Sequence, residues 1–148
     1  MNVIVQPQKG TYKILFLDNL QVRAVGIAEI DATAKGHRPG HYRVKWGRKH
    51  QFRATPSKEL VVSLRKATVY LTQDDEHFEA FLHDFQIPFT HAKVCRICLM
   101  EDRVTPLNKK NSVRYTTGEQ VCFECARREL RRELATMGKV GTQALGHL

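Results

Sequence analysis

The 148-residue sequence contains no long apolar run. A transmembrane helix needs about 20 consecutive apolar residues, and no stretch approaches that length, so we expect no membrane partner. The N-terminus, MNVIVQPQKG, lacks the basic segment and the apolar segment of a signal peptide. We therefore expect a cytoplasmic protein, in which a reducing environment disfavours stable disulfides.

Motifs of the common catalytic sites are also absent. There is no Gly-x-x-x-x-Gly-Lys-Ser/Thr phosphate-binding loop, because GKVGT at 138–142 has the wrong order and spacing of glycine and lysine. The sequence contains no His-Glu-x-x-His, no Gly-x-Ser-x-Gly and no cysteine–histidine nucleophile arrangement. We therefore expect a binding protein without enzymatic activity of its own.

Acidic residues are missing between Asp31 and Glu59, although basic residues are frequent there. The whole chain has 24 Lys and Arg against 15 Asp and Glu, a formal net charge of +9. A positive surface attracts polyanions, but an excess of charge can also serve solubility alone. Because an ordinary solvated face mixes both signs of charge, we predict that this interval binds phosphates. The predicted nucleic-acid contacts are Lys35, Arg38, Arg43, Lys45, Arg48, Lys49 and Arg53.

Cysteine is scarce, and the four cysteines form two Cys-x-x-Cys pairs. Doubled pairs are typical of a four-thiolate zinc site, because each two-residue turn presents two sulfurs to one side. A redox dithiol needs only one pair, usually on a βαβ scaffold, and the flanking sequence predicts no such scaffold. We predict one structural Zn²⁺, since four thiolates leave no open position for water. The predicted ligands are Cys95, Cys98, Cys122 and Cys125, and nearby His91 is interpreted as a surface residue.

Hydrophobic periodicity predicts an α+β fold for residues 1–89, with a small, mostly antiparallel sheet or barrel and two helices. Residues 2–30 are rich in β-branched and aromatic residues, as strands are. Residues 42–46 alternate between apolar and basic side chains, which indicates a half-buried strand. Helices are predicted at 55–66, where Thr-Pro makes a good start, and at about 74–88.

Smaller features complete this basic domain. Residues 47–49 predict a turn into a partner strand around Phe52, and TVYLT at 68–72 predicts a short strand. The second helix carries apolar residues at i, i+3, i+4 and i+7, which we assign to the core. They are Phe78, Phe81, Leu82 and Phe85.

Residues 90–137 are predicted to form a separate zinc-binding domain. After the first cysteine pair, SVRYTTGEQVC at 112–122 predicts a hairpin with Gly118 in its turn. The second pair opens a helix at 123–137, and this order of elements resembles a treble-clef zinc finger. Residues 138–148 contain three glycines and are expected to be a linker or tail. The apolar stripe of the helix is Phe123, Ala126, Leu130, Leu134 and Met137.

Four arginines of this helix lie outside its apolar stripe and are predicted to contact nucleic acid. Arginine forks onto phosphates and stacks on unpaired bases. At helical spacing Glu124 and Glu129 can pair with two of the arginines, so part of the cluster can also be ordinary helix surface. The four are Arg127, Arg128, Arg131 and Arg132.

The segment CRICLMEDRVTPLNKKNSVRYTTGEQVCFECARREL and the β-rich sequence before it resemble the N-terminal region of archaeal superkiller-type (Ski-like) DExH RNA helicases. The specific part is the four-cysteine set followed by the Glu/Arg-rich helix. In that family the region precedes an ATP-driven helicase core, beside a ribonuclease of the cleavage-and-polyadenylation type in RNA processing and decay. The resemblance implies RNA and a helicase core in cis as partners. Because the chain has no helicase motif, ATP hydrolysis is not implied for it.

Three functional hypotheses follow from these patterns. The first is a zinc-binding accessory module that binds nucleic acid, with single-stranded RNA favoured, and docks it to an ATP-dependent Ski-like helicase. The second is a protein-interaction adaptor that recruits a ribonuclease of the RNA-decay machinery. The third is a stand-alone DNA-binding regulator, because zinc modules often insert a helix into the major groove.

Overall fold

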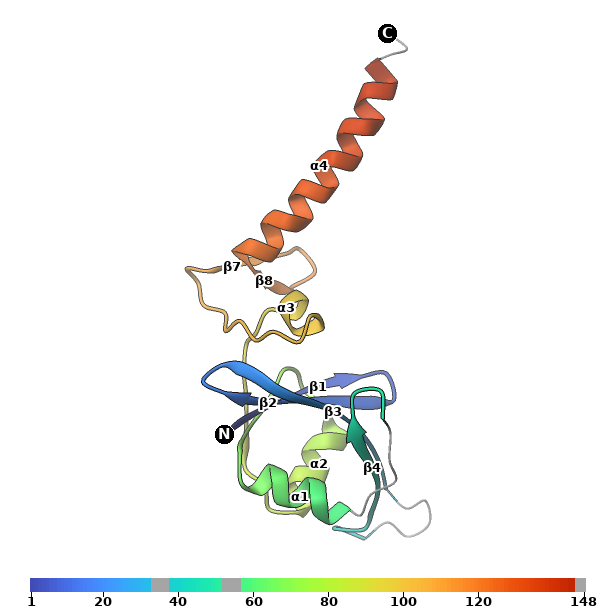
Figure 1. The fold of residues 1–148 in the computed structure, drawn as a ribbon, viewed down its shortest axis with the longest axis vertical. Coiled ribbons are helices and arrows are strands. Elements are labelled where there is room, and N and C mark those ends of the chain that lie inside the picture. Colours follow the sequence, from blue (N-terminus) through green and yellow to red (C-terminus); the bar gives the residue numbers. More distant parts are fainter. Residues whose placement is uncertain (33–37, 52–56, 146–148) are drawn as a thin grey trace. The chain divides into compact units, whose positions relative to one another are not determined.

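The computed structural model describes residues 1–32, 38–51 and 57–145 and divides into two compact units (Figure 1). The first unit comprises residues 1–93 together with 102–104, and the second comprises the remaining residues from 94 onward. The domain seam predicted between residues 89 and 90 therefore falls inside the first unit.

A six-stranded, mostly antiparallel sheet forms the first unit with two helices, which confirms the predicted α+β class. Neighbouring strands β1 to β4 pair antiparallel, whereas β5 pairs parallel with β1 and β6 parallel with β5. In the described part of the chain β4 and β6 are the sheet edges, so the sheet is open and the barrel alternative is wrong. The strands are β1 (Asn2–Gln8), β2 (Thr11–Asp18), β3 (Gln21–Ala32), β4 (Tyr42–Arg48), β5 (Thr68–Leu71) and β6 (Phe89–His91).

Turn residues set the strand connections. Between β2 and β3, Asn19 and Leu20 have φ values of 50° and 65°. Positive φ at both central residues matches the right-handed twist of a two-residue hairpin, and asparagine tolerates it well. After β4, His50 has φ 79° and Gln51 bridges back to Arg48, so the chain turns at residues 49–50. The turn was predicted at residues 47–49, but Gly47 and Arg48 still belong to β4. The partner strand predicted around Phe52 lies outside the described residues.

Both predicted helices of this unit are present, as α1 (Ser57–Arg65) and α2 (Glu76–Asp84). The Asp75 carboxylate caps α2 by accepting the Phe78 backbone N–H at 2.9 Å. The Glu79 carboxylate accepts the Asp75 N–H at 3.1 Å, completing a reciprocal capping arrangement. The start predicted for α1, Thr55 and Pro56, lies outside the described residues.

Side chains from the sheet and both helices share one apolar core, as the periodicity predicted. Three of the four residues predicted as core on α2 are fully buried, and the fourth, Phe85, is partly buried against the same cluster. The fully buried members of this cluster include Val3, Val5, Ile14, Leu60, Leu64, Val69, Leu71, Phe78, Phe81 and Leu82.

Gly26 of β3 lies under the ring of Trp46, the chain's single tryptophan. A Cβ atom added at Gly26 would lie 2.1 Å from Cη2 of that ring, well inside van der Waals contact. We therefore expect Gly26→Ala to destabilise the first unit by about 1–3 kcal/mol, the usual cost of overpacking, and to shift the tryptophan fluorescence. Urea unfolding followed by far-UV circular dichroism measures the cost.

A double-mutant cycle provides the control for this prediction. In a Trp46→Ala background the clash is gone, so Gly26→Ala should cost much less. An equal cost in both backgrounds would contradict the contact as the cause.

The second unit contains α3 (Arg96–Met100), β7 (Ser112–Arg114), β8 (Gln120–Cys122) and α4 (Phe123–Leu145). Strands β7 and β8 pair antiparallel, and Gly118 in their connection has φ +91°, as expected for the predicted hairpin. Helix α4 continues to Leu145, where we predicted a tail from residue 138. Glycine lowers helix propensity by about 1 kcal/mol but keeps its backbone N–H, so the glycines there do not end the helix.

Within the described residues, no helix combines the length and the apolar character that crossing a bilayer requires.

Candidate metal centre

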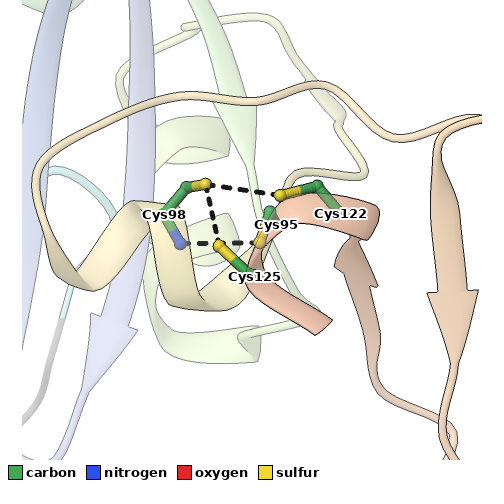
Figure 2. A group of neighbouring side chains, drawn as sticks. All are labelled: Cys95, Cys98, Cys122 and Cys125. Atoms are coloured by element: carbon green, nitrogen blue, oxygen red, sulfur yellow. Dashed lines mark hydrogen bonds between the residues drawn. The ribbon is translucent and has the colours of Figure 1, made fainter. Parts of the chain in front are cut away.

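The four cysteines converge from three elements of the second unit (Figure 2). Cys95 caps α3 and Cys98 lies in that helix, whereas Cys122 ends β8 and Cys125 lies in the first turn of α4. The hairpin returns the chain to α3, so the two pairs meet although a long loop separates them in sequence. All four side chains are buried, with at most 7% exposure.

The sulfur positions fit one tetrahedral metal ion. All four Sγ atoms lie within 4.8 Å of one another. The Sγ atom of Cys98 lies 3.7 Å from that of Cys122 and 3.4 Å from that of Cys125. A tetrahedron with metal–sulfur bonds of about 2.3 Å has edges of about 3.8 Å. A disulfide requires about 2.05 Å, and all four cysteines are free. The cluster could therefore hold a metal ion.

The surroundings shift the pKa values of Cys95, Cys98 and Cys125 in different directions. Burial raises the pKa of Cys125 to about 12, against a hydrogen bond from Arg128 that lowers it. Burial likewise raises the pKa of Cys98. For Cys95 burial is outweighed by backbone hydrogen bonds at Cys122 and Cys98, so its pKa is lowered. A bound metal requires thiolates and must displace protons from the buried thiols, so its affinity falls in acid.

One arginine of α4 contacts this centre directly. Nη2 of Arg128 lies 3.3 Å from the Cys125 sulfur and 3.3 Å from a carboxylate oxygen of Glu101. Glu101 is the C-cap of α3, the helix that carries Cys98. Of the four arginines predicted to bind nucleic acid, Arg128 is thus hydrogen-bonded to the cysteine cluster, whereas Arg127, Arg131 and Arg132 are exposed.

The basic residues predicted in the first unit are exposed where they are described. On β4 the alternation is as expected, with Val44 buried and Arg43 and Lys45 exposed. Arg38, Arg48 and Lys49 are exposed as well. The other two predicted contacts, Lys35 and Arg53, lie outside the described residues.

Acidic residues from other strands and loops approach this basic interval. Strand pairing places Glu29 opposite Lys45, and their charged atoms are 3.8 Å apart. Asp31 is the cross-strand partner of Arg43. Lys49 donates to Asp102 at 2.9 Å. The interval has no acidic residue in the sequence, but acidic residues from elsewhere lie next to it in space. Of the predicted contacts that the structure describes, Arg38 and Arg48 are given no acidic neighbour by the pairings above.

Among the described residues the most buried charged side chain is that of Lys13, which no pattern in the sequence marked as important. Lys13 on β2 is only 4% exposed and forms an ion pair with Asp102, which also accepts from Lys49. All three residues belong to the first unit, because residues 102–104 do. The one local sign of this buried ion pair is a lysine within the predicted strand sequence TYKILFLD, but no residue near it in the sequence identifies Asp102 as its partner.

His91, interpreted as a surface residue, is separate from the cysteine cluster. Its Nε2 lies 3.0 Å from Asp74 and 3.9 Å from Glu79, in the first unit. These three side chains lie close enough to share an ion, but Asp74 is exposed and Glu79 is already part of the α2 cap. The positive end of the α2 dipole also disfavours a cation at this position.

Comparison with known proteins gives one partial match. The chain is 27% identical over 79 residues to a probable ATP-dependent helicase from Methanocaldococcus jannaschii. The match covers 53% of this chain and 10% of the helicase, so the chain spans only a small part of its relative. No family model matches the sequence, and no solved structure matches it either.

Proposed function

We propose that this chain is a zinc-binding module that binds single-stranded RNA as an accessory region of a cytoplasmic, Ski-like ATP-dependent helicase. The observation that carries the proposal is the buried four-cysteine cluster at the start of α4, a helix with exposed arginines. The partial similarity to an archaeal helicase supports the helicase context. In this proposal ATP hydrolysis belongs to a helicase core in cis.

Zinc is the metal that suits the cluster best. Four thiolates in a tetrahedron favour zinc or an iron–sulfur site over the oxygen-loving cations. Cys95, Cys98, Cys122 and Cys125 would all bind one ion, which leaves no open position, so its role would be structural. We also propose that the second unit is a treble clef, which the order of turn, hairpin and helix with a cysteine in its first turn supports. Zinc, when bound, supplies cross-links between these elements.

The proposed RNA contacts are the exposed arginines. Arg127, Arg131 and Arg132 lie on neighbouring turns of α4, where guanidinium groups can bind phosphates and stack on unpaired bases. In the first unit Arg38 and Arg48 are exposed and extend the proposal, whereas Arg43, Lys45 and Lys49 have acidic neighbours. Helix α4 is therefore the stronger candidate surface.

A salt titration of RNA binding tests this function. Each lost phosphate contact reduces the slope of log K against log salt by about 0.7 for a single strand. The triple variant Arg127→Gln, Arg131→Gln, Arg132→Gln should lower the slope by about two and weaken binding strongly at low salt. Fluorescence anisotropy with a labelled single-stranded RNA measures both quantities.

A variant with the same charge change elsewhere is the matched control. Lys9, Lys66 and Lys93 are exposed in the first unit, and their replacement by glutamine removes the same net charge. The control should keep most of the affinity. Equal losses in both variants, or no RNA affinity of the wild type at low salt, would refute the proposed surface. Preference for duplex DNA would instead favour the regulator hypothesis.

A second function is favoured by the apolar stripe of α4. Its large side chains are 44% to 66% exposed. Two of them, Phe123 and Leu130, line a groove of about 700 Å³ together with residues of the β7–β8 hairpin. Such exposed apolar surface is typical of protein interaction sites. We propose the ribonuclease adaptor as the alternative. The stripe residues concerned are Phe123, Leu130, Leu134 and Met137.

The two functions respond to different variants. Leu130→Ser with Leu134→Ser should abolish capture of a purified ribonuclease of the cleavage-and-polyadenylation type if the chain is an adaptor, and should leave RNA affinity unchanged. The arginine triple variant should give the opposite pattern if RNA binding is the function.

A further inference from the structure

We infer that Arg128 is a positioning residue of the metal centre, which joins the two cysteine pairs through Cys125 and Glu101, and not an RNA contact. This assignment depends on the metal-binding part of the proposed function and is independent of its RNA-binding part.

The contacts of Arg128 lie on both sides of the cluster. Its Nη2 atom donates to the Cys125 sulfur, in the first turn of α4, and to Glu101, directly after α3. Both distances are 3.3 Å. Its Nε atom is buried, although the side chain as a whole is 39% exposed. One guanidinium therefore connects the helix of the second cysteine pair with the end of the helix of the first pair.

The charge of the site explains why a cation belongs there. Four thiolates around a divalent ion have a net charge of −2, and the four cysteine side chains are buried. A buried uncompensated charge is unfavourable, so an adjacent guanidinium stabilises the thiolate form that a metal requires. An N–H···S hydrogen bond also withdraws electron density from the sulfur, which makes it less reactive toward electrophiles. Groups that hold metal ligands in this way typically change affinity by about 10–100-fold.

Helix geometry separates Arg128 from its neighbours. It lies three residues after Cys125, so the two side chains share one side of α4. Arg127 and Arg131 lie two and six residues after Cys125, so both project away from the Cys125 side of α4, and both are exposed. Arg131 therefore offers a matched control, with the same side chain, the same helix and the same charge.

The test measures metal binding by the full chain. We expect Arg128→Gln to weaken Zn²⁺ binding about tenfold in competition with a chromophoric chelator, and Arg131→Gln to leave it unchanged. In cobalt-substituted protein the sulfur-to-metal charge-transfer band should shift in Arg128→Gln, because one sulfur loses its hydrogen bond. Alkylation of the zinc-loaded protein by iodoacetamide should accelerate in the same variant only.

Arg128→Lys is the second variant, because it keeps the positive charge without the planar fork. We expect an affinity between those of the wild type and Arg128→Gln. Wild-type affinity and cobalt spectrum in both Arg128 variants would overturn the inference, as would an equal loss in Arg131→Gln. If the wild type binds no zinc, the proposed metal site fails as well, whereas one bound zinc with unaffected Arg128 variants refutes this inference alone.

Discussion

Removal of the metal is expected to unfold the second unit and to leave the first unit folded. The main buried cluster of the second unit consists of the four cysteines and Val121, with a few partly buried neighbours, and Leu99 of α3 is the further buried apolar residue among those described. The large apolar side chains of α4 are exposed and add little to this core. A structural zinc contributes about 10–16 kcal/mol in zinc-finger peptides, far more than so few apolar contacts can supply.

Chelation and ligand substitution measure this effect. Treatment with a strong chelator, or the substitution Cys122→Ser, should abolish the β7–β8 signals in a ¹H–¹⁵N correlation spectrum and reduce helical circular dichroism. Trp46 lies in the first unit and is the single tryptophan, so its fluorescence should stay native. Acidification should release the metal in the same way, because protons compete for the thiolates.

Elemental analysis of the purified protein tests whether the second unit needs a bound metal in order to fold. One zinc per chain is expected in purified protein and none in Cys122→Ser. A second unit that stays folded without any bound metal would show that the cysteines serve as ordinary core residues.

The substitution Asp102→Asn is expected to destabilise the first unit by about 2–3 kcal/mol at neutral pH. Breaking a buried ion pair costs about 3–5 kcal/mol. The expected loss of unfolding free energy is smaller here because the Asp102 side chain is 28% exposed. Lys13 is almost fully buried, so it would lose its carboxylate partner in a site that water hardly reaches. Lys49 is partly exposed, so Lys49→Gln should cost less than 1 kcal/mol.

The pH dependence of this effect has a defined sign. Burial acts to raise the pKa of Asp102, but hydrogen bonds from Lys13 and Lys49 outweigh it and lower the pKa. A lowered folded-state pKa means that the stabilisation is complete above the usual aspartate pKa of about 4 and is lost as the pH falls through the lowered value. The difference between wild type and Asp102→Asn should therefore narrow in acid.

Urea unfolding followed by Trp46 fluorescence at neutral and acidic pH measures both predictions. Asp18 is an exposed aspartate of β2, and Asp18→Asn is the matched control with the same chemical change. Equal stability of wild type and Asp102→Asn at neutral pH would mean that the ion pair does not contribute to folding.

Features with a local physical cause were predicted well. The α2 stripe is buried because helical spacing alone places its apolar residues on one face. The β7–β8 turn was predicted because Gly118 tolerates the positive φ that it adopts. The end predicted for α4, at residue 137, was wrong because glycine weakens a helix without preventing it. The barrel alternative was wrong because closure of a sheet depends on pairing between strands that are distant in the sequence.

The sequence by itself determined which residues form the four-cysteine cluster, because two-residue spacing within each cysteine pair is a local constraint and the chain has no other cysteines. Only the tertiary structure decided which charged side chains have a partner of opposite charge and which remain free to bind a ligand. Strand register brings Glu29 to Lys45, the loop after α3 brings Asp102 to Lys13, and the meeting of α3 and α4 brings Glu101 to Arg128. These pairs are far apart along the chain, and side-chain charge says nothing about which distant segment will face it until the fold has been formed.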